Sequence, residues 1–172
     1  MAKTLYIMCG PAGAGKTTYV RKHAAPGVSA HISRDKVRFS MVGEDEEYFS
    51  KEIEVYAEFC RQIDAALDAP WVEEVWADAT HLTASARKKL LCNLKHKIKD
   101  LWIYVVVIMP DVETCIKQNN LRSGRANVPE TIIRNMHASY QDPWDDGVAY
   151  EEVYNEVKRN EYLCNKRSSL WT

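Results

Sequence analysis

One stretch decides the fold: Gly10-Pro11-Ala12-Gly13-Ala14-Gly15-Lys16-Thr17, which carries the pattern G-x-x-x-x-G-K-[ST]. An apolar run, Thr4 to Cys9, precedes it, and a segment of helical composition, Gly15 to Ala24, follows it. In a strand, loop and helix of this order, glycines let successive backbone N–H groups point inward, and the helix adds the positive end of its dipole. The stretch is therefore expected to bind phosphate groups.

The side chains of this loop predict ATP and Mg²⁺ as cofactors. Lys16 is expected to reach the β and γ phosphates, and the Thr17 hydroxyl to ligate Mg²⁺. A glycine-rich turn that only packs a helix against a sheet would not need these two residues. The predicted nucleotide site comprises Gly10, Pro11, Ala12, Gly13, Ala14, Gly15, Lys16, Thr17 and Thr18.

Strands and helices alternate along the rest of the chain. Further strands are expected at Val28 to Ser33, Val72 to Ala77 and Leu101 to Met109, with a weaker one near Val148 to Val157. This alternation favours a mainly parallel sheet that is covered on both sides. The predicted fold class is α/β, of the P-loop NTPase type, with a central sheet of four to five strands, helices on both faces and a helical lid.

The longest predicted helix runs from Glu44 to Asp68. Its apolar residues recur in steps of four and three, which places them on one helical stripe. These residues are Phe49, Ile53, Tyr56, Cys60, Ile63 and Leu67. The acidic run from Glu44 to Glu47 would form the first turn, where it suits the positive end of the helix dipole.

The bulk composition is that of one ordinary domain, expected to span residues 1–172. The chain has 172 residues, of which 46% are hydrophobic and 27% charged, and its formal net charge is −1. Such a charge excludes a large basic surface for nucleic acid. The longest apolar run is too short to cross a bilayer and no secretory leader is apparent, so we expect a cytoplasmic protein without a membrane partner. Five scattered cysteines suggest buried free thiols.

A candidate acceptor site follows the second predicted strand. Asp35 and Arg38 lie three residues apart and would share a helix face, so that a carboxylate able to take a proton sits beside a guanidinium able to hold a phosphate. An ordinary surface ion pair is the competing interpretation. Asp78 ends the third strand at the same sheet edge, where it could bind magnesium through water or orient Arg38; a structural role in the turn is its alternative.

A second group of cations follows the fourth strand. Arg122-Ser123-Gly124-Arg125 lies between two predicted helices, on the kind of segment that closes over phosphates and brings positive charge to the transition state. We expect a lid over about residues 117–135, with Arg122 or Arg125 acting in catalysis.

Together these pieces resemble the kinase domain of the phage-type 5′-hydroxyl polynucleotide kinases, within the small P-loop kinases related to adenylate kinase. The shared features are the phosphate loop, a strand-end R-D-x-x-R, a strand-end D-x-T and an R-x-G-R-like lid followed by V-P, over about Lys3 to Tyr140. The resemblance implies that Asp35 is the general base, that Arg38 contacts a phosphate of the acceptor nucleotide, and that Asp78 helps to order the acceptor. A lid arginine would bridge the donor phosphates, a role that falls on Arg122 or Arg125.

The expected function is therefore transfer of the γ-phosphate of ATP to a hydroxyl of a nucleic acid, first the 5′-hydroxyl of DNA or RNA. A second reading changes the acceptor to a hydroxymethylated base in DNA, a nucleoside or another small molecule. A third is a nucleotide-dependent switch or NTPase, which would give Asp35 beside Arg38 no evident task. The sequence leaves the oligomeric state open.

Overall fold

The computed structural model describes residues 2–96, 98–146, 150 and 152–155. Among these residues the chain forms a five-stranded sheet with the order β2-β3-β1-β4-β5, and each neighbouring pair is parallel. The strands are β1 Lys3–Cys9, β2 Ser29–Ser33, β3 Glu74–Asp78, β4 Leu101–Val107 and β5 Glu152–Asn155. The predicted parallel α/β sheet is confirmed. Of the weak strand expected near Val148 to Val157, residues 148, 149, 151, 156 and 157 lie outside the described residues.

The described helices connect these strands. They are α1 Lys16–His23, α2 Arg34–Met41, α3 Glu52–Asp68, α4 Ala84–Asn93, α5 Val112–Asn119 and α6 Glu130–Ala138, with 3₁₀ turns at Ile98–Asp100, Gly124–Ala126 and Pro143–Asp145. Thr83 caps α4, since its side chain accepts a hydrogen bond from the Ala86 N–H at 3.1 Å. Among the described helices, none has both the length and the apolar character needed to span a bilayer.

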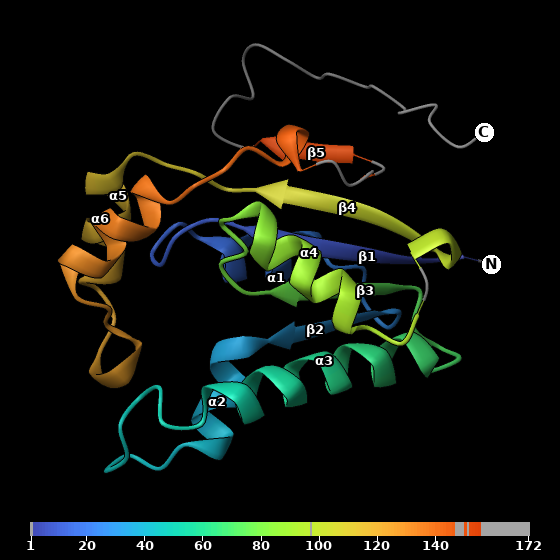
Figure 1. Ribbon diagram of the computed structural model, residues 1–172, viewed down its shortest axis with the longest axis horizontal. Coiled ribbons are helices and arrows are strands. Elements are labelled where there is room, and N and C mark those ends of the chain that lie inside the picture. The colour runs from blue at the N-terminus through green and yellow to red at the C-terminus, as the bar shows by residue number, and fades with distance from the viewer. Residues whose placement is uncertain (1, 97, 147–149, 151, 156–172) are drawn as a thin grey trace.

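The sheet carries helices on both faces, and Figure 1 shows α4 in front of it and α1 behind it. Alternate residues of β1 point to opposite faces, so Leu5 and Ile7 pack on one side and Met8 on the other. The first side is the larger core, which includes Phe59 of α3 and Leu90 of α4. The second side is covered by α1, α5 and α6.

Parallel pairing brings three predicted site segments to one sheet edge. The phosphate-binding loop follows the carboxyl end of β1, the central strand, and α2 follows β2 directly. Ser33 at the end of β2 is the register partner of Asp78 at the end of β3. In open parallel sheets this edge is where ligands bind.

Two predictions were wrong. Cys92, expected as a buried thiol, is exposed, although Cys9, Cys60 and Cys115 are buried. The start of the longest helix also differs from the prediction. Residues 44–51 form turns, and α3 begins only at Glu52. Cys60, Ile63 and Leu67 are buried as the apolar stripe required, but Phe49 and Ile53 are exposed. Side-chain bonds from Tyr48 back to α2 hold this segment in a non-helical path, so the acidic run does not form the first turn of α3.

Candidate active site

The phosphate-binding loop needs its glycines for two separate reasons. Gly13 has φ +78°, and a Cβ built on it would lie 2.1 Å from the carbonyl oxygen of Cys115 in α5. Gly15, at the start of α1, has φ +95°. A residue with a side chain would clash at the first position and be strained at the second. The loop is therefore shaped by packing against α5 as well as by its own turns.

Lys16 lies folded over this loop. Its Nζ donates to the carbonyl oxygens of Gly10 at 2.9 Å and Pro11 at 2.7 Å. Burial lowers the pKa of the ammonium group, the charges of Asp78 and Asp35 oppose that shift, and the charge of Arg122 adds to it. Three of the predicted site residues thus act electrostatically on Lys16, although they come from β3, α2 and the segment after α5.

Asp78 is buried at the end of β3 and receives two hydrogen bonds on one oxygen. Thr17 Oγ1 donates to Asp78 Oδ2 at 2.7 Å, and His31 Nε2 lies 2.9 Å from the same oxygen. Burial raises the pKa of Asp78, but the bond from His31 and the charge of Lys16 outweigh it, so the pKa lies below its usual value. The sequence interpretation missed His31; the available signal was a polar ring inside a strand beside β3.

Thr17 and Asp78 fit the chemistry of magnesium. Both offer hard oxygen ligands, and Mg²⁺ usually binds one or two such protein groups while keeping waters and substrate phosphates in its remaining positions. The structure, over the residues it describes, has no cluster of three His, Cys, Asp or Glu side chains that would form a protein-only metal cage. A metal held mainly by nucleotide and water is the kind of site that these two residues suit.

Asp35 and Arg38 meet on one face of α2, as the spacing predicts. Arg38 Nη1 donates to Asp35 Oδ1 at 3.1 Å and to the Tyr48 hydroxyl at 3.2 Å. Arg38 is only 5% exposed, whereas the Asp35 side chain is 62% exposed. The pair therefore combines a fixed cation with a carboxylate that an acceptor can reach.

Glu52 is a further member of this group that sequence reasoning did not identify. It accepts from Arg38 Nη2 at 2.6 Å and also pairs with Arg34. The Nε atoms of Arg34 and Arg38 are buried and have no hydrogen-bond partner within the described structure. Such unpaired buried donors are costly and uncommon in folded proteins.

The two candidate lid arginines have different surroundings. Arg125 Nη1 donates to the carbonyl oxygens of Val42 and Gly43 at 2.8 and 2.9 Å, so it joins the 3₁₀ turn Gly124–Ala126 to the end of α2. For Arg122, within the described residues, the side chain makes no hydrogen bond or ion pair, while its charge acts on Lys16. The buried Asn119 side chain connects the two ends of the segment that carries both arginines. It donates to the Val128 carbonyl oxygen at 2.8 Å and accepts from the Val128 N–H at 3.0 Å.

The turn after β3 braces the phosphate-binding loop. Gly10 N–H donates to the Thr80 carbonyl oxygen at 2.9 Å, and His81 Nδ1 lies 2.9 Å from the Met8 carbonyl oxygen. Since a carbonyl oxygen only accepts, Nδ1 carries the hydrogen. His81 is buried and has φ 39°, a backbone conformation that costs energy for a non-glycine residue.

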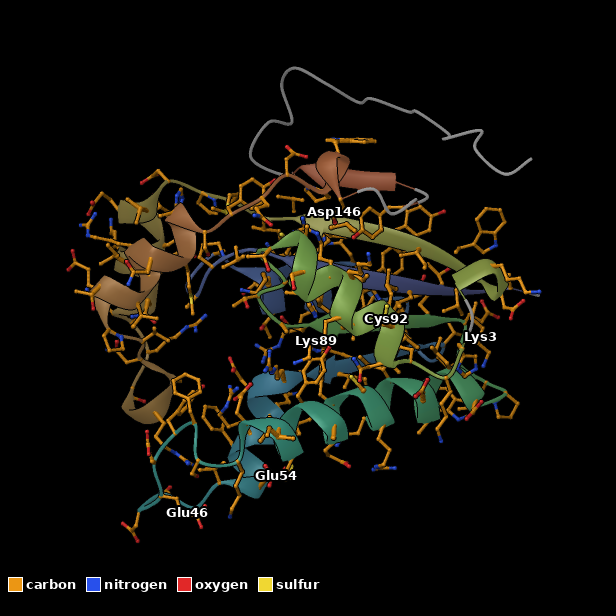
Figure 2. All side chains as sticks on the ribbon, in the orientation of Figure 1. Lys3, Glu46, Glu54, Lys89, Cys92 and Asp146 are labelled. Atoms are coloured by element: carbon orange, nitrogen blue, oxygen red, sulfur yellow. The ribbon has the colours of Figure 1, made fainter. Side chains whose placement is uncertain are left out.

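A fully buried ion pair holds the far side of this turn. Arg87 of α4 donates from Nε and Nη2 to the two carboxylate oxygens of Asp146, both at 2.6 Å. It also donates from Nη1 to the His81 carbonyl at 2.8 Å. Figure 2 shows Asp146 beside α4. One guanidinium group thus connects α4, the turn after β3 and the segment after α6, which is a structural role.

Comparison with protein families gives one match: residues 5–143 fit a family described as an AAA domain. A search among curated proteins finds no match.

Several solved structures share the fold. A chain of the Pnkp1/Rnl/Hen1 RNA repair complex superposes with a TM-score of 0.65 at 19% identity, over 80% of this chain and 43% of that one. A fungal RNA kinase gives 0.58 at 18% identity, over 90% and 75%. A gluconokinase from Sinorhizobium meliloti 1021 gives 0.52 at 14% identity, over 90% and 81%. The present chain spans less than half of the RNA repair protein, and at these identities the likeness is one of fold.

Proposed function

We propose that this chain, which belongs to the AAA domain family, is an ATP-dependent kinase that phosphorylates a hydroxyl of a nucleic acid, first the 5′-hydroxyl of DNA or RNA. The observation that carries the proposal is geometric. Thr17, next to Lys16 in the phosphate-binding loop, donates from Oγ1 to Asp78 Oδ2 at 2.7 Å, which places a hydroxyl and a carboxylate suited to magnesium together. On the neighbouring α2, Arg38 holds the exposed carboxylate of Asp35 at 3.1 Å, and this carboxylate is able to accept a proton. The charges of Asp35, Asp78 and Arg122 also act on the Lys16 ammonium group.

The proposed reaction is a single in-line transfer. Asp35 accepts the proton of the attacking hydroxyl as the oxygen forms a bond to the γ-phosphorus, and the bond from that phosphorus to the β–γ bridging oxygen breaks, leaving ADP. Lys16 and Arg122 neutralise the charge that spreads over the transferring group. The exposed carboxylate of Asp35 supports its role, since an acceptor hydroxyl must approach it directly.

Magnesium would be held by Thr17, with Asp78 acting directly or through water. When bound with ATP, it supplies charge neutralisation on the β and γ oxygens. His31 would act as a positioning residue, because its bond to Asp78 Oδ2 helps to fix the carboxylate that faces Thr17.

A nucleic acid is the favoured acceptor because Arg38 is held beside the proposed base, Asp35. The positive charge of its guanidinium group would attract a phosphate next to the reacting nucleotide. The fold likeness to a fungal RNA kinase and to a chain of an RNA repair complex agrees with this choice.

A small-molecule acceptor is the second candidate. The fold likeness to a gluconokinase, which covers most of both chains, favours it. A hydroxymethylated base in DNA or a nucleoside would use the same groups. A switch without an acceptor fits less well, because Asp35 would then lie exposed beside Arg38 without a substrate hydroxyl to deprotonate.

Labelled ATP distinguishes these possibilities. The protein is incubated with 5′-hydroxyl DNA and RNA oligonucleotides, duplexes with hydroxymethylated bases, nucleosides and gluconate, and a Lys16→Ala variant serves as the blank. We expect the label on the 5′-hydroxyl oligonucleotides. Label on gluconate or free nucleosides alone would replace the proposal with a small-molecule kinase, and label released only as inorganic phosphate would replace it with an NTPase.

A further inference from the structure

An exposed aromatic cluster lies next to Asp35. Phe39, Tyr48 and Phe49 form a continuous chain of rings, with centroids 6.3 Å apart for the first pair and 4.8 Å for the second. Phe39 is 37% exposed and Phe49 is 61% exposed. Burying such rings in the core would normally be favourable, so their exposure in one place marks a surface that meets a ligand.

The cluster is joined to the proposed acceptor site by direct contacts. Phe39 lies one turn after Asp35 on α2, and residues four apart share a helix face. The Tyr48 hydroxyl lies 3.4 Å from Asp35 Oδ1 and bonds to Arg38. A ligand on these rings would therefore have its reacting end close to the Asp35 carboxylate.

Two guanidinium groups border the same rings. The Arg38 Cζ lies 4.6 Å from the ring centre of Tyr48 and 5.4 Å from that of Phe49. The Arg125 Cζ lies 5.2 Å from the ring centre of Phe39. Rings that alternate with guanidinium groups are the combination on which unpaired bases stack, because each base offers a flat π face and its phosphate a negative charge.

We propose that Phe39, Tyr48 and Phe49 form a stacking surface for the terminal bases of a single-stranded nucleic-acid acceptor. The inference rests on the proposed kinase function and extends it, because it makes unpaired bases at the 5′ end the feature that the protein recognises. Stacking is tolerant of sequence, so the surface selects single strands over paired ends without selecting particular bases.

The local charges limit the length of strand that this surface can hold. The connection between α2 and α3 carries the acidic residues 44–47, which repel a phosphate chain. Glu46 pairs with Lys51 at 2.8 Å, and Figure 2 shows it at the outer end of the connection. The chain also lacks a large excess of basic residues. The surface therefore suits one or two bases at the reacting end, not an extended strand.

Binding is tested with a 5′-hydroxyl oligonucleotide that carries a dye at its 3′ end. The comparison strand has the same length and backbone but carries abasic sites at its first two positions. Fluorescence anisotropy gives the dissociation constant of each, and kinase assays give KM and kcat. Phe49→Ala should weaken binding of the complete strand by about 5- to 150-fold, the range measured for loss of one base–aromatic stack. It should leave binding of the abasic strand and the KM for ATP unchanged, and Phe49→Trp should keep wild-type affinity.

Trp71→Ala is the matched control. Trp71 is 59% exposed, close to the value for Phe49, but it precedes β3 and so lies at the opposite edge of the sheet. This variant should bind both strands as the wild type does. Equal losses for Phe49→Ala on the complete and abasic strands would overturn the stacking proposal, because Phe49 would then act only by supporting Arg38.

The two proposals fail in different ways. If the affinity measured by anisotropy depends on Phe49 and on the terminal bases but no phosphate is transferred, the stacking surface is supported and the kinase function is refuted. If the wild type phosphorylates the oligonucleotides and Phe49→Ala binds them with wild-type affinity, the kinase function is supported and the stacking surface is refuted. If the wild type binds and phosphorylates neither strand, both are wrong.

Discussion

Protonation of His81 should destabilise the protein as the pH falls. Burial lowers the pKa of this ring to about 4 from 6.5, although the bond to Met8 opposes the shift. Between these two values the unfolded chain takes up a proton that the folded chain does not, so the free energy of unfolding falls with falling pH. The difference between 6.5 and about 4 corresponds to a loss of about 3 kcal/mol in the free energy of unfolding between pH 7 and pH 4. The full contribution is present above pH 6.5 and decreases towards pH 4.

Urea denaturation at several pH values between 7.5 and 4, followed by tryptophan fluorescence, measures this loss. His81→Asn is the control variant, since asparagine tolerates the positive φ of this position better than most residues and does not titrate in the range. The variant will be less stable throughout, because it loses packing near Phe59, but its pH dependence should be flatter by about 3 kcal/mol. Equal pH dependence in the two proteins would refute the argument, because His81 would then titrate in the folded state as it does in the unfolded chain.

The remaining predictions concern the proposed chemistry. Lys16→Ala should retain less than about a tenth of wild-type turnover with its fold intact, as measured by labelled-ATP transfer and circular dichroism; higher activity would remove Lys16 from the site. Asp35→Asn should slow transfer by roughly a hundred- to ten-thousandfold while ATP affinity, measured by calorimetry, stays constant, and a parallel loss of both would make Asp35 a structural or metal-binding residue. Arg122→Ala should reduce kcat by about a thousandfold, and Arg125→Ala should have a smaller effect, because Arg125 is already bonded to Val42 and Gly43; the reverse order would show that Arg125 is the clamp.

The parallel sheet and the geometry of the phosphate-binding loop were predictable because their signals are local. The loop is eight consecutive residues whose glycines, lysine and threonine each have a conformational or chemical reason to be there. The pairing of Asp35 with Arg38 was equally predictable, since a spacing of three on a helix brings side chains together.

Contacts between distant segments were not predictable in this way. His31 reaches Asp78 across 47 residues, and Arg87 reaches Asp146 across 59. The start of α3 was misplaced for a related reason. The helical period continues through Phe49 and Ile53, and only the return of Tyr48 to Arg38 reveals that the chain turns there instead. A local sequence pattern does not show that a tertiary hydrogen bond competes with continuation of the helix.

The Arg87–Asp146 pair also determines how far the chain must extend to fold. A fragment ending at residue 143 would keep every residue of the family match, yet it would leave the Arg87 guanidinium in the interior without its carboxylate. Loss of one partner from a buried pair usually costs about 3–5 kcal/mol, a large share of the stability of a domain of this size. During synthesis, Asp146 must therefore leave the ribosome before this domain can complete its core. A variant trimmed to the family boundary should fail to accumulate in cells, whereas one ending after Asn155, which keeps both the ion pair and β5, should accumulate.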